Sequence, residues 1–472
     1  MMKIIYSIII IIAIVSSACK KSFLDVKPKD ELIVPESLPE LQELLDNDRL
    51  MNGYSGSSVS GPTPALLVVG TDDYYIPDNF YNGSTFKDVQ RNIYIWAKEN
   101  VYGVTPIIYD WDAPYQAIFI ANAALKQLSK IDRTSSVANL WDNIKGSSLF
   151  YRAFAFYGLS QAFAPPYEKS NAATESGIIL RTDADISVPS TRATVKETYD
   201  RIIEDLLEAL PMLPLKPLYK TRPSKPAAFA LLARTYLSMR DYDNALKYSD
   251  SCLKLYDTLI DYKVNFSSIP PASVYPFERF NAEVIFHSIS ARQPVDLLFT
   301  PAYARIDSTL FSSYDSSDLR KEIYFRVRES NPMTYSYRGS YDNTSSPFTG
   351  LATDEMYLIR AECYARKNDI EAALSDLNNL LRNRWKIGYT DYFSSNPTEV
   401  LNKILIERRK ELIYRGTRWM DIRRLNKEGA NIIPKRKVNG QEYSLAVDDL
   451  RYTWPIPNYV LAFNPGMQQN PR

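Results

Sequence analysis

The chain has 472 residues, 45% of them hydrophobic, and this composition excludes a largely disordered protein. Its 56 Lys and Arg residues against 55 Asp and Glu residues leave a formal net charge of +1, so the chain lacks the broad positive surface that a nucleic-acid partner requires. Three cysteines and one histidine, His287, argue against a disulfide scaffold, His-rich metal sites and histidine-dependent hydrolysis, and we expect neither a metal nor a cofactor.

The N-terminus has the pattern of an export signal. Lys3 precedes an apolar run over residues 4–15, and three small residues then lead into Cys19. The run is shorter than the roughly 20 residues that a membrane-spanning helix needs. We therefore expect residues 1–18 to be removed as a signal peptide and Cys19 to become a lipidated N-terminus that anchors the chain to a membrane. The alternative is an ordinary signal peptide followed by an incidental cysteine.

Helices are predicted first in the N-terminal part of the mature chain, residues 19–256. An irregular stretch over 53–92 comes before three blocks with helical periodicity, at about 113–129, 141–163 and 195–210. Prolines follow the second and third blocks, and proline cannot continue a helix. These blocks predict long helices that are separated by loops.

An internal repeat predicts how the helices pack. The set Ala233, Tyr236 and Ala245 recurs at the same spacing as Ala361, Tyr364 and Ala373. Small residues let two antiparallel helices approach closely, and the tyrosine fills the gap between them, as in tetratricopeptide hairpins. The predicted fold class is therefore mostly α, a tetratricopeptide-like scaffold of helical hairpins with long irregular loop insertions. Cys252 and Cys363 lie in amphipathic patterns and are expected in the core, a single disulfide being the alternative.

The two hairpins flank an irregular insertion, residues 257–350, rich in Ser, Pro, Tyr, Phe and Asn. Loops this long are functional or disordered, and the aromatic content argues against disorder.

The C-terminal part, 351–472, adds a charged helix pair over 404–425 that is broken at Gly416, and then an extended tail. The arginines of this pair could form an anion site, but acidic residues at helical spacing favour ion pairs. Trp419 is expected in the core.

The aromatic loops supply the candidate ligand-binding residues. Rings stack on the C–H faces of sugars while carboxylates and amides bind their hydroxyl groups. Trp96 and Tyr74 are the first choices. The candidates are Asp72, Asp73, Tyr74, Tyr75, Tyr81, Tyr94 and Trp96 in the first stretch, and Tyr275, Phe277, Tyr335, Tyr337 and Tyr341 in the second. Any one ring could instead fix its loop to the helices.

Two other functions fit parts of the sequence. A carboxylate pair such as Asp72 and Asp73 is what glycoside hydrolysis requires, but adjacent residues cannot flank a bond from two sides, so we expect no enzyme and no catalytic residue. An adaptor that binds proteins in a tetratricopeptide groove is the other alternative. The aromatic insertions favour capture of a small ligand.

Several motifs resemble the SusD/RagB family of nutrient-binding outer-membrane lipoproteins. They are the block from Glu407 to Leu425, Trp454-Pro-Ile-Pro457, Asn464-Pro465, Gln469-Asn470-Pro471, Ser22-Phe-Leu-Asp25, and Trp111 with Tyr115, Ile118 and Ala121-Asn122. The resemblance spans nearly all of residues 19–472. It implies capture of an oligosaccharide, or in some branches a peptide, at the outer membrane for a SusC-like TonB-dependent β-barrel transporter. It also implies that the protein faces the cell surface, although Lys20-Lys21-Ser22 lacks the acidic cluster often associated with transport to that face.

Overall fold

The computed structural model describes residues 35–54, 61–266 and 274–472. The predicted signal peptide and Cys19 lie outside these ranges. Long helices dominate the described part: α2 (Leu38–Leu45), α7 (Tyr109–Leu128), α8 (Ala138–Phe163), α9 (Val195–Ala209), α10 (Lys225–Met239), α11 (Tyr242–Leu253), α15 (Thr353–Arg366), α16 (Ile370–Arg382), α17 (Pro397–Glu411) and α18 (Arg418–Asn426). Within the described ranges, no helix is long and apolar enough to cross a membrane.

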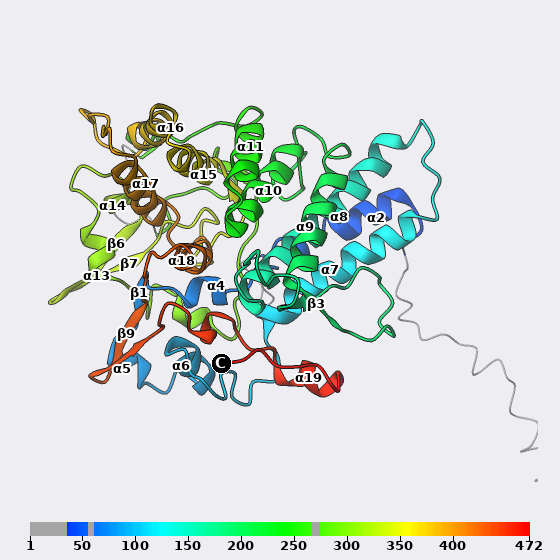
Figure 1. Ribbon diagram of the computed structural model, residues 1–472, viewed down its shortest axis with the longest axis horizontal. Helices are drawn as coiled ribbons and strands as arrows, with labels where there is room; N and C mark the ends of the chain where they lie inside the picture. Colours follow the sequence, from blue (N-terminus) through cyan, green and yellow to red (C-terminus); the bar gives the residue numbers. More distant parts are fainter. Residues whose placement is uncertain (1–34, 55–60, 267–273) are drawn as a thin grey trace, which may run out of the picture.

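These helices form a continuous scaffold of neighbours. In Figure 1 they follow one another from α2, α7 and α8 on the right, through α9, α10 and α11, to α15, α16 and α17 on the left. Each helix packs on the next, and α11 bridges to α15 across the long insertion between them in sequence. The mostly α, tetratricopeptide-like fold expected from the repeat is therefore confirmed.

The repeated alanines lie where two helices meet. Ala233 and Ala245, on α10 and α11, are fully buried, and so are Ala361 and Ala373 on α15 and α16. Tyr236 stacks on Tyr248 across the first hairpin with 5.5 Å between ring centroids. The small residues thus allow the close approach that the spacing predicts.

Local sequence sets the ends of these helices. The side chain of Thr194 accepts a hydrogen bond from the backbone N–H of Glu197 and begins α9, while Asp241 and Asp369 do the same for the second helix of each repeat hairpin. Gly416, with a φ of +75°, lies between α17 and α18, where a left-handed conformation suits glycine. The predicted break at this glycine is confirmed.

The stretches without helical periodicity contain many short elements. Short helices occur at α3 (Asp48–Met51), α4 (Leu66–Val69), α5 (Asp78–Tyr81), α6 (Asp88–Tyr94), α12 (Tyr262–Asn265), α13 (Ser308–Ser312), α14 (Arg320–Ile323) and α19 (Asn458–Phe463), with 3-10 turns η2 (Asp296–Leu298) and η3 (Leu450–Tyr452). The insertion at 257–350 is therefore more regular than its sequence indicates, because its helices are too short to show a periodic pattern.

The strands form two-stranded antiparallel sheets throughout the described residues. The pairs are β1 (Tyr74–Tyr75) with β5 (Arg305–Ile306), β2 (Ser176–Ile179) with β3 (Arg192–Thr194), β4 (Val284–Phe286) with β8 (Leu351–Ala352), β6 (Phe325–Ser330) with β7 (Met333–Tyr337), and β9 (Lys435–Val438) with β10 (Gln441–Ser444). In Figure 1 the sheets β1–β5, β6–β7 and β9–β10 lie on one side, beneath α14 and α17. The chain thus consists of a helical scaffold and a loop-rich region beside it.

Buried ion pairs hold the charged helix pair, as its interleaved charges predict. Arg408 Nε lies 2.9 Å from Asp421, and Arg424 Nη1 lies 2.6 Å from Glu362 on α15. The side chain of Trp419 is fully buried and stacks on Trp454 with 5.7 Å between centroids. Both predictions for this segment, ion pairs and a core tryptophan, are confirmed. Cys252, Cys363 and His287 are likewise buried, and both thiols are free.

Arg423 behaves differently from the other arginines of this segment, because it binds backbone carbonyls at the end of α8. Its guanidinium donates to the carbonyls of Gln161 and Ala164. The backbone N–H of Trp454 donates to Ala162 at 2.9 Å, and the side chain of Asn470 donates to Phe163 at 2.8 Å. The carbonyls that α8 leaves without a helical partner are therefore satisfied by α18 and the C-terminal tail.

Candidate functional site

The two aromatic loops predicted to bind ligand meet in the folded chain. Strand β1 of the first loop pairs with β5 of the second, placing Tyr75 opposite Arg305. The backbone N–H of Asp307 also donates to the carbonyl of Asp73 at 3.0 Å. Segments more than 200 residues apart thus share one surface, so the loops can act on one ligand together.

Six half-buried rings lie along these two loops, and we call the region that carries them the aromatic surface. Phe80 and Tyr303 pack edge to face with 5.4 Å between centroids, and Phe311 stacks on Tyr335 at 3.6 Å. The first loop contributes Tyr75, Phe80 and Tyr81, and the second contributes Tyr303, Phe311 and Tyr335. Val327 and Met333 on the β6–β7 hairpin are more than half exposed and extend the apolar area.

An ion pair crosses the aromatic surface. Arg305 Nε lies 2.8 Å from Glu329, and the guanidinium lies 5.3 Å from the centroid of Phe80. The arginine is buried, whereas the Glu329 side chain is 42% exposed and can accept further hydrogen bonds. Burial and the nearby Glu329 raise the pKa of Tyr75, so its hydroxyl stays a neutral donor. Rings, a carboxylate and a phenol therefore lie together at this surface.

The two first-choice rings, Trp96 and Tyr74, lie inside the protein, and so does the candidate Tyr94. Trp96 and Tyr94 are fully buried and Tyr74 is 2% exposed. They surround the guanidinium of Arg436 from β9, which lies 4.3 Å from the Trp96 centroid and 4.2 Å from that of Tyr94. The indole N–H of Trp96 donates to the carbonyl of Gly70 at 3.0 Å. The expectation that these rings face a ligand is corrected here, since they pack against the C-terminal part instead.

A second group of predicted residues is also internal. Tyr341 is 2% exposed and donates to Glu283 at 2.6 Å, and its ring lies 4.7 Å from that of Phe277. Tyr337, 9% exposed, packs edge to face on Tyr414. These rings fix the second loop to the scaffold. Tyr275 is half-buried and lies outside the aromatic surface as we define it.

The two adjacent aspartates are structural anchors. Arg418 binds Asp72 through two nitrogens, each at 2.9 Å, and Arg409 Nε lies 3.1 Å from Asp73. Burial favours a raised pKa for Asp72, but Arg418 and Arg409 outweigh it and hold that pKa below its usual value. For Asp73 burial prevails and raises the pKa. Both carboxylates tie the first loop to α17 and α18 rather than facing a ligand.

Three buried carboxyl groups offer the geometry of a metal cluster. Oxygen atoms of Glu283, Asp354 and Glu411 lie within 4.8 Å of one another. Arg384 contacts both Glu283 and Glu411 at 2.7 Å, and Arg415 pairs with Asp354. Burial, with the neighbouring carboxylates, raises the pKa of Asp354 to about 7. Arginines thus supply the positive charge here, and the cluster joins the second loop to α15 and α17.

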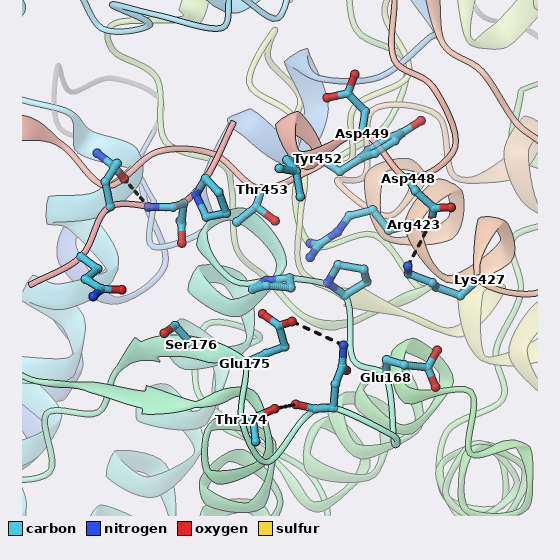
Figure 2. Close-up of a pocket in the computed structure, with 18 of the residues that line it drawn as sticks. Glu168, Thr174, Glu175, Ser176, Arg423, Lys427, Asp448, Asp449, Tyr452 and Thr453 are labelled. Carbon is cyan, nitrogen blue, oxygen red and sulfur yellow. Dashed lines mark hydrogen bonds and ion pairs between the residues drawn. The ribbon is translucent and has the colours of Figure 1, made fainter.

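A separate cleft lies at the end of α8, and we call it the tail cleft. Its volume is about 380 Å³. Its lining comes from the turn after α8 (Pro165, Pro166, Glu168, Asn171, Thr174, Glu175 and Ser176), from Arg192, from Arg423 and Lys427, from Val447 to Thr453 except Arg451, and from Gln468 to Pro471. Figure 2 shows Arg423 reaching toward the middle of the view, between Thr453 and Glu175.

Comparisons with known proteins identify the family. Residues 22–237 match a family model described as starch-binding and associating with the outer membrane, and residues 308–472 match the SusD family model. The chain belongs to the SusD family. The resemblance of the sequence motifs to this family is thereby confirmed.

Several known proteins are similar to this SusD-family protein in sequence or in structure. A SusD-like protein P2 from Formosa agariphila is 25% identical over 419 residues, which cover 76% of this chain and 79% of that protein. A SusD superfamily crystal structure from Bacteroides thetaiotaomicron superposes with a TM-score of 0.73 at 21% identity, covering 92% of this chain and all of that one. A putative sugar-binding protein from Bacteroides vulgatus gives 0.71 at 21%, covering 93% and 99%.

Several residues of the aromatic surface were missed by sequence reasoning. Phe80, Tyr303, Phe311, Arg305 and Glu329 were not among the candidates, although all lie in or beside stretches singled out as irregular and aromatic. Composition cannot tell a half-buried ring from a core ring. No local sequence signal distinguishes Phe80 and Tyr303 from the buried Tyr94 and Trp96.

Proposed function

We propose that this SusD-family protein binds an oligosaccharide at the aromatic surface without changing it chemically. The observation that carries the proposal is the β1–β5 pairing, which joins two loops distant in sequence that carry six half-buried rings, and which brings Tyr75 and Phe80 next to the Arg305–Glu329 pair. Rings that are partly exposed can stack on sugar faces, and Glu329 and Tyr75 can bind hydroxyl groups.

Two further findings support a carbohydrate ligand. One family model that matches this chain is described as starch-binding, and one similar solved structure is described as a putative sugar-binding protein. The carboxylates first considered for catalysis, Asp72 and Asp73, are engaged by arginines. This supports binding rather than hydrolysis.

We further propose that the protein acts at the outer membrane. Cleavage before Cys19 and acylation of its thiol would anchor residues 19–472, the predicted SusD-like unit, to the membrane and present the aromatic surface outside the cell. A SusC-like TonB-dependent β-barrel would receive the ligand. Labelling with a fatty-acid probe should mark the wild-type protein and not Cys19→Ala, and detergent extraction should recover the protein together with a large β-barrel.

The binding proposal is tested with a soluble form that starts at Lys20. A glycan array identifies a ligand, and calorimetry then compares variants that remove exposed rings, Tyr75→Ala and Tyr335→Ala. Each ring contributes about 1 kcal/mol beyond its buried area, so each variant should bind about fivefold more weakly. Tyr219→Ala, an exposed ring on the α9–α10 loop, is the matched control and should bind like the wild type.

Three results would overturn the proposal. They are unchanged affinity in both ring variants, release of shorter sugars from the ligand, and selection of peptides with no glycan bound. The melting temperature of each variant shows whether a loss of affinity reflects a folding defect. Since Tyr75 and Tyr335 are half-buried, we expect their variants to stay folded.

A further inference from the structure

The tail cleft contains a buried cation with unused hydrogen-bonding capacity. Arg423 is 3% exposed, and its two terminal nitrogens donate to the carbonyls of Gln161 and Ala164. Its Nε is buried and has no hydrogen-bond partner among the described residues. Burial without a neighbouring carboxylate lowers the pKa of Arg423 to about 10. A buried charge of this kind is costly unless an anion approaches it.

A second guanidinium beside the cleft also lacks a counter-ion. Arg192 donates to the carbonyls of Ser176 and Gly177 and to the side chain of Asn470, and none of the ion pairs found in the described ranges involves it. Burial lowers its pKa as well. Two positive charges at one cleft therefore remain without a carboxylate of the protein next to them.

Most of the acidic side chains at the cleft are already neutralised. Glu168 pairs with Arg240 at 2.8 Å, Asp448 pairs with Lys427 at 3.1 Å, and Asp449 pairs with Arg451 at 2.5 Å. Glu175 is exposed and accepts a hydrogen bond from Asn171 at 3.4 Å. When these ion pairs are left out, the guanidinium groups of Arg423 and Arg192 and the carboxylate of Glu175 remain. The cleft therefore has a net positive charge.

The walls of the cleft suit a sugar ring that carries this anion. Pro165, Pro166 and Leu450 supply apolar faces, and the neighbouring carboxylates and glutamines can bind hydroxyl groups. The volume of about 380 Å³ lies in the range of small-ligand sites. We propose that the tail cleft is a second binding site, separate from the aromatic surface, that takes a carboxylate-bearing sugar residue and places its carboxylate beside Arg423.

Calorimetry with four matched probes tests this proposal on the soluble chain from Lys20. Methyl glucuronide and methyl galacturonide differ from methyl glucoside and methyl galactoside in carrying a carboxylate in place of a primary alcohol. We expect at least one acidic probe to bind about tenfold more tightly than its neutral counterpart, because a charge-assisted hydrogen bond is stronger than a neutral one. Raising the ionic strength should reduce this preference.

Variants at the cleft locate the binding. Thr174→Trp places a large side chain at an exposed lining position and should abolish binding of the acidic probe, while Thr134→Trp, exposed in the α7–α8 loop, is the matched control. Glu175→Gln removes the unpaired carboxylate and should raise affinity about threefold. Arg423→Lys should weaken binding of the acidic probe. If Arg423→Lys fails to fold, Thr174→Trp and Glu175→Gln still test whether the probe binds in the cleft.

Several outcomes would overturn the proposal: equal binding of acidic and neutral probes, no binding of either acidic probe, or binding that survives Thr174→Trp. The test is independent of the aromatic surface. Tyr75→Ala should leave the affinity for the acidic probe unchanged, and Thr174→Trp should leave glycan binding at the aromatic surface unchanged.

Discussion

The side chain of Asn470 should be a main support of the contact between α8 and the C-terminal tail. It is 4% exposed and donates to the carbonyls of Phe163 at 2.8 Å and Trp454 at 2.7 Å. Its oxygen accepts a hydrogen bond from Arg192 at 2.7 Å. Asn470→Ala would leave two buried carbonyls without this donor, whereas Arg192 would keep its other acceptors.

The cost of this change follows from the two orphaned carbonyls. A buried polar group that loses its partner costs about 1–3 kcal/mol, so the two carbonyls together should lower the free energy of unfolding of Asn470→Ala by about 2–6 kcal/mol. With an unfolding entropy of about 2.1 cal/mol/K per residue over about 450 residues, this corresponds to a melting temperature about 2–6 °C lower.

Thermal and urea unfolding of the soluble chain provide the measurement. Asn82→Ala is the control, because Asn82 is exposed and its side chain bonds to that of Asn439 on the surface. It should change stability by less than about 0.5 kcal/mol. If Asn470→Ala unfolded at the same temperature and urea concentration as Asn82→Ala, the reasoning that the tail stabilises the end of α8 would be refuted.

Three other predictions concern stability. Asp72→Asn should lose its ion pairs with Arg418 and Arg409 and destabilise the chain by about 1–3 kcal/mol, while calorimetry should show unchanged glycan affinity. Ala361→Trp should overfill the contact of α15 and α16 and cost about 1–3 kcal/mol or more, so an unchanged melting temperature would contradict close helix packing. Burial raises the pKa of Asp110 to about 7, because the buried carboxyl group is more stable in its neutral form. The stabilisation that the neutral carboxyl contributes is present in full below about pH 4 and is lost as the pH rises to 7. The free energy of unfolding of the wild type, relative to that of Asp110→Asn, should therefore fall by as much as about 4 kcal/mol between about pH 4 and pH 7. Urea unfolding of both proteins at several pH values measures this difference. A difference that does not change with pH would contradict the reasoning.

The helical scaffold was predictable from sequence because its determinants are local. Periodic apolar residues, the prolines after α8 and α9, and the recurring Ala–Tyr–Ala set fix where helices run and which faces approach closely. The interleaved charges of α17 and α18 likewise predict ion pairs, since residues three and four apart share a helix face. Family membership followed from the same segments.

The candidate site was predictable only as two regions. Sequence reasoning located the aromatic loops, but it ranked Trp96 and Tyr74 first, and both surround Arg436, a residue more than 330 positions away. A buried ring and a half-buried ring have the same local sequence signals. Only the long-range contact distinguishes them.

The amino-acid sequence by itself determined the helices, their close hairpins, the charged pairing at the C-terminus and the family. The tertiary structure alone decided which rings reach the surface, that β1 and β5 join the two loops, and that Arg423 lies beside a cleft without a carboxylate partner among the described residues. The physical reason is the range of the interactions. Helix formation depends on neighbours within one or two turns, whereas burial and charge pairing depend on segments that meet only when the chain has folded.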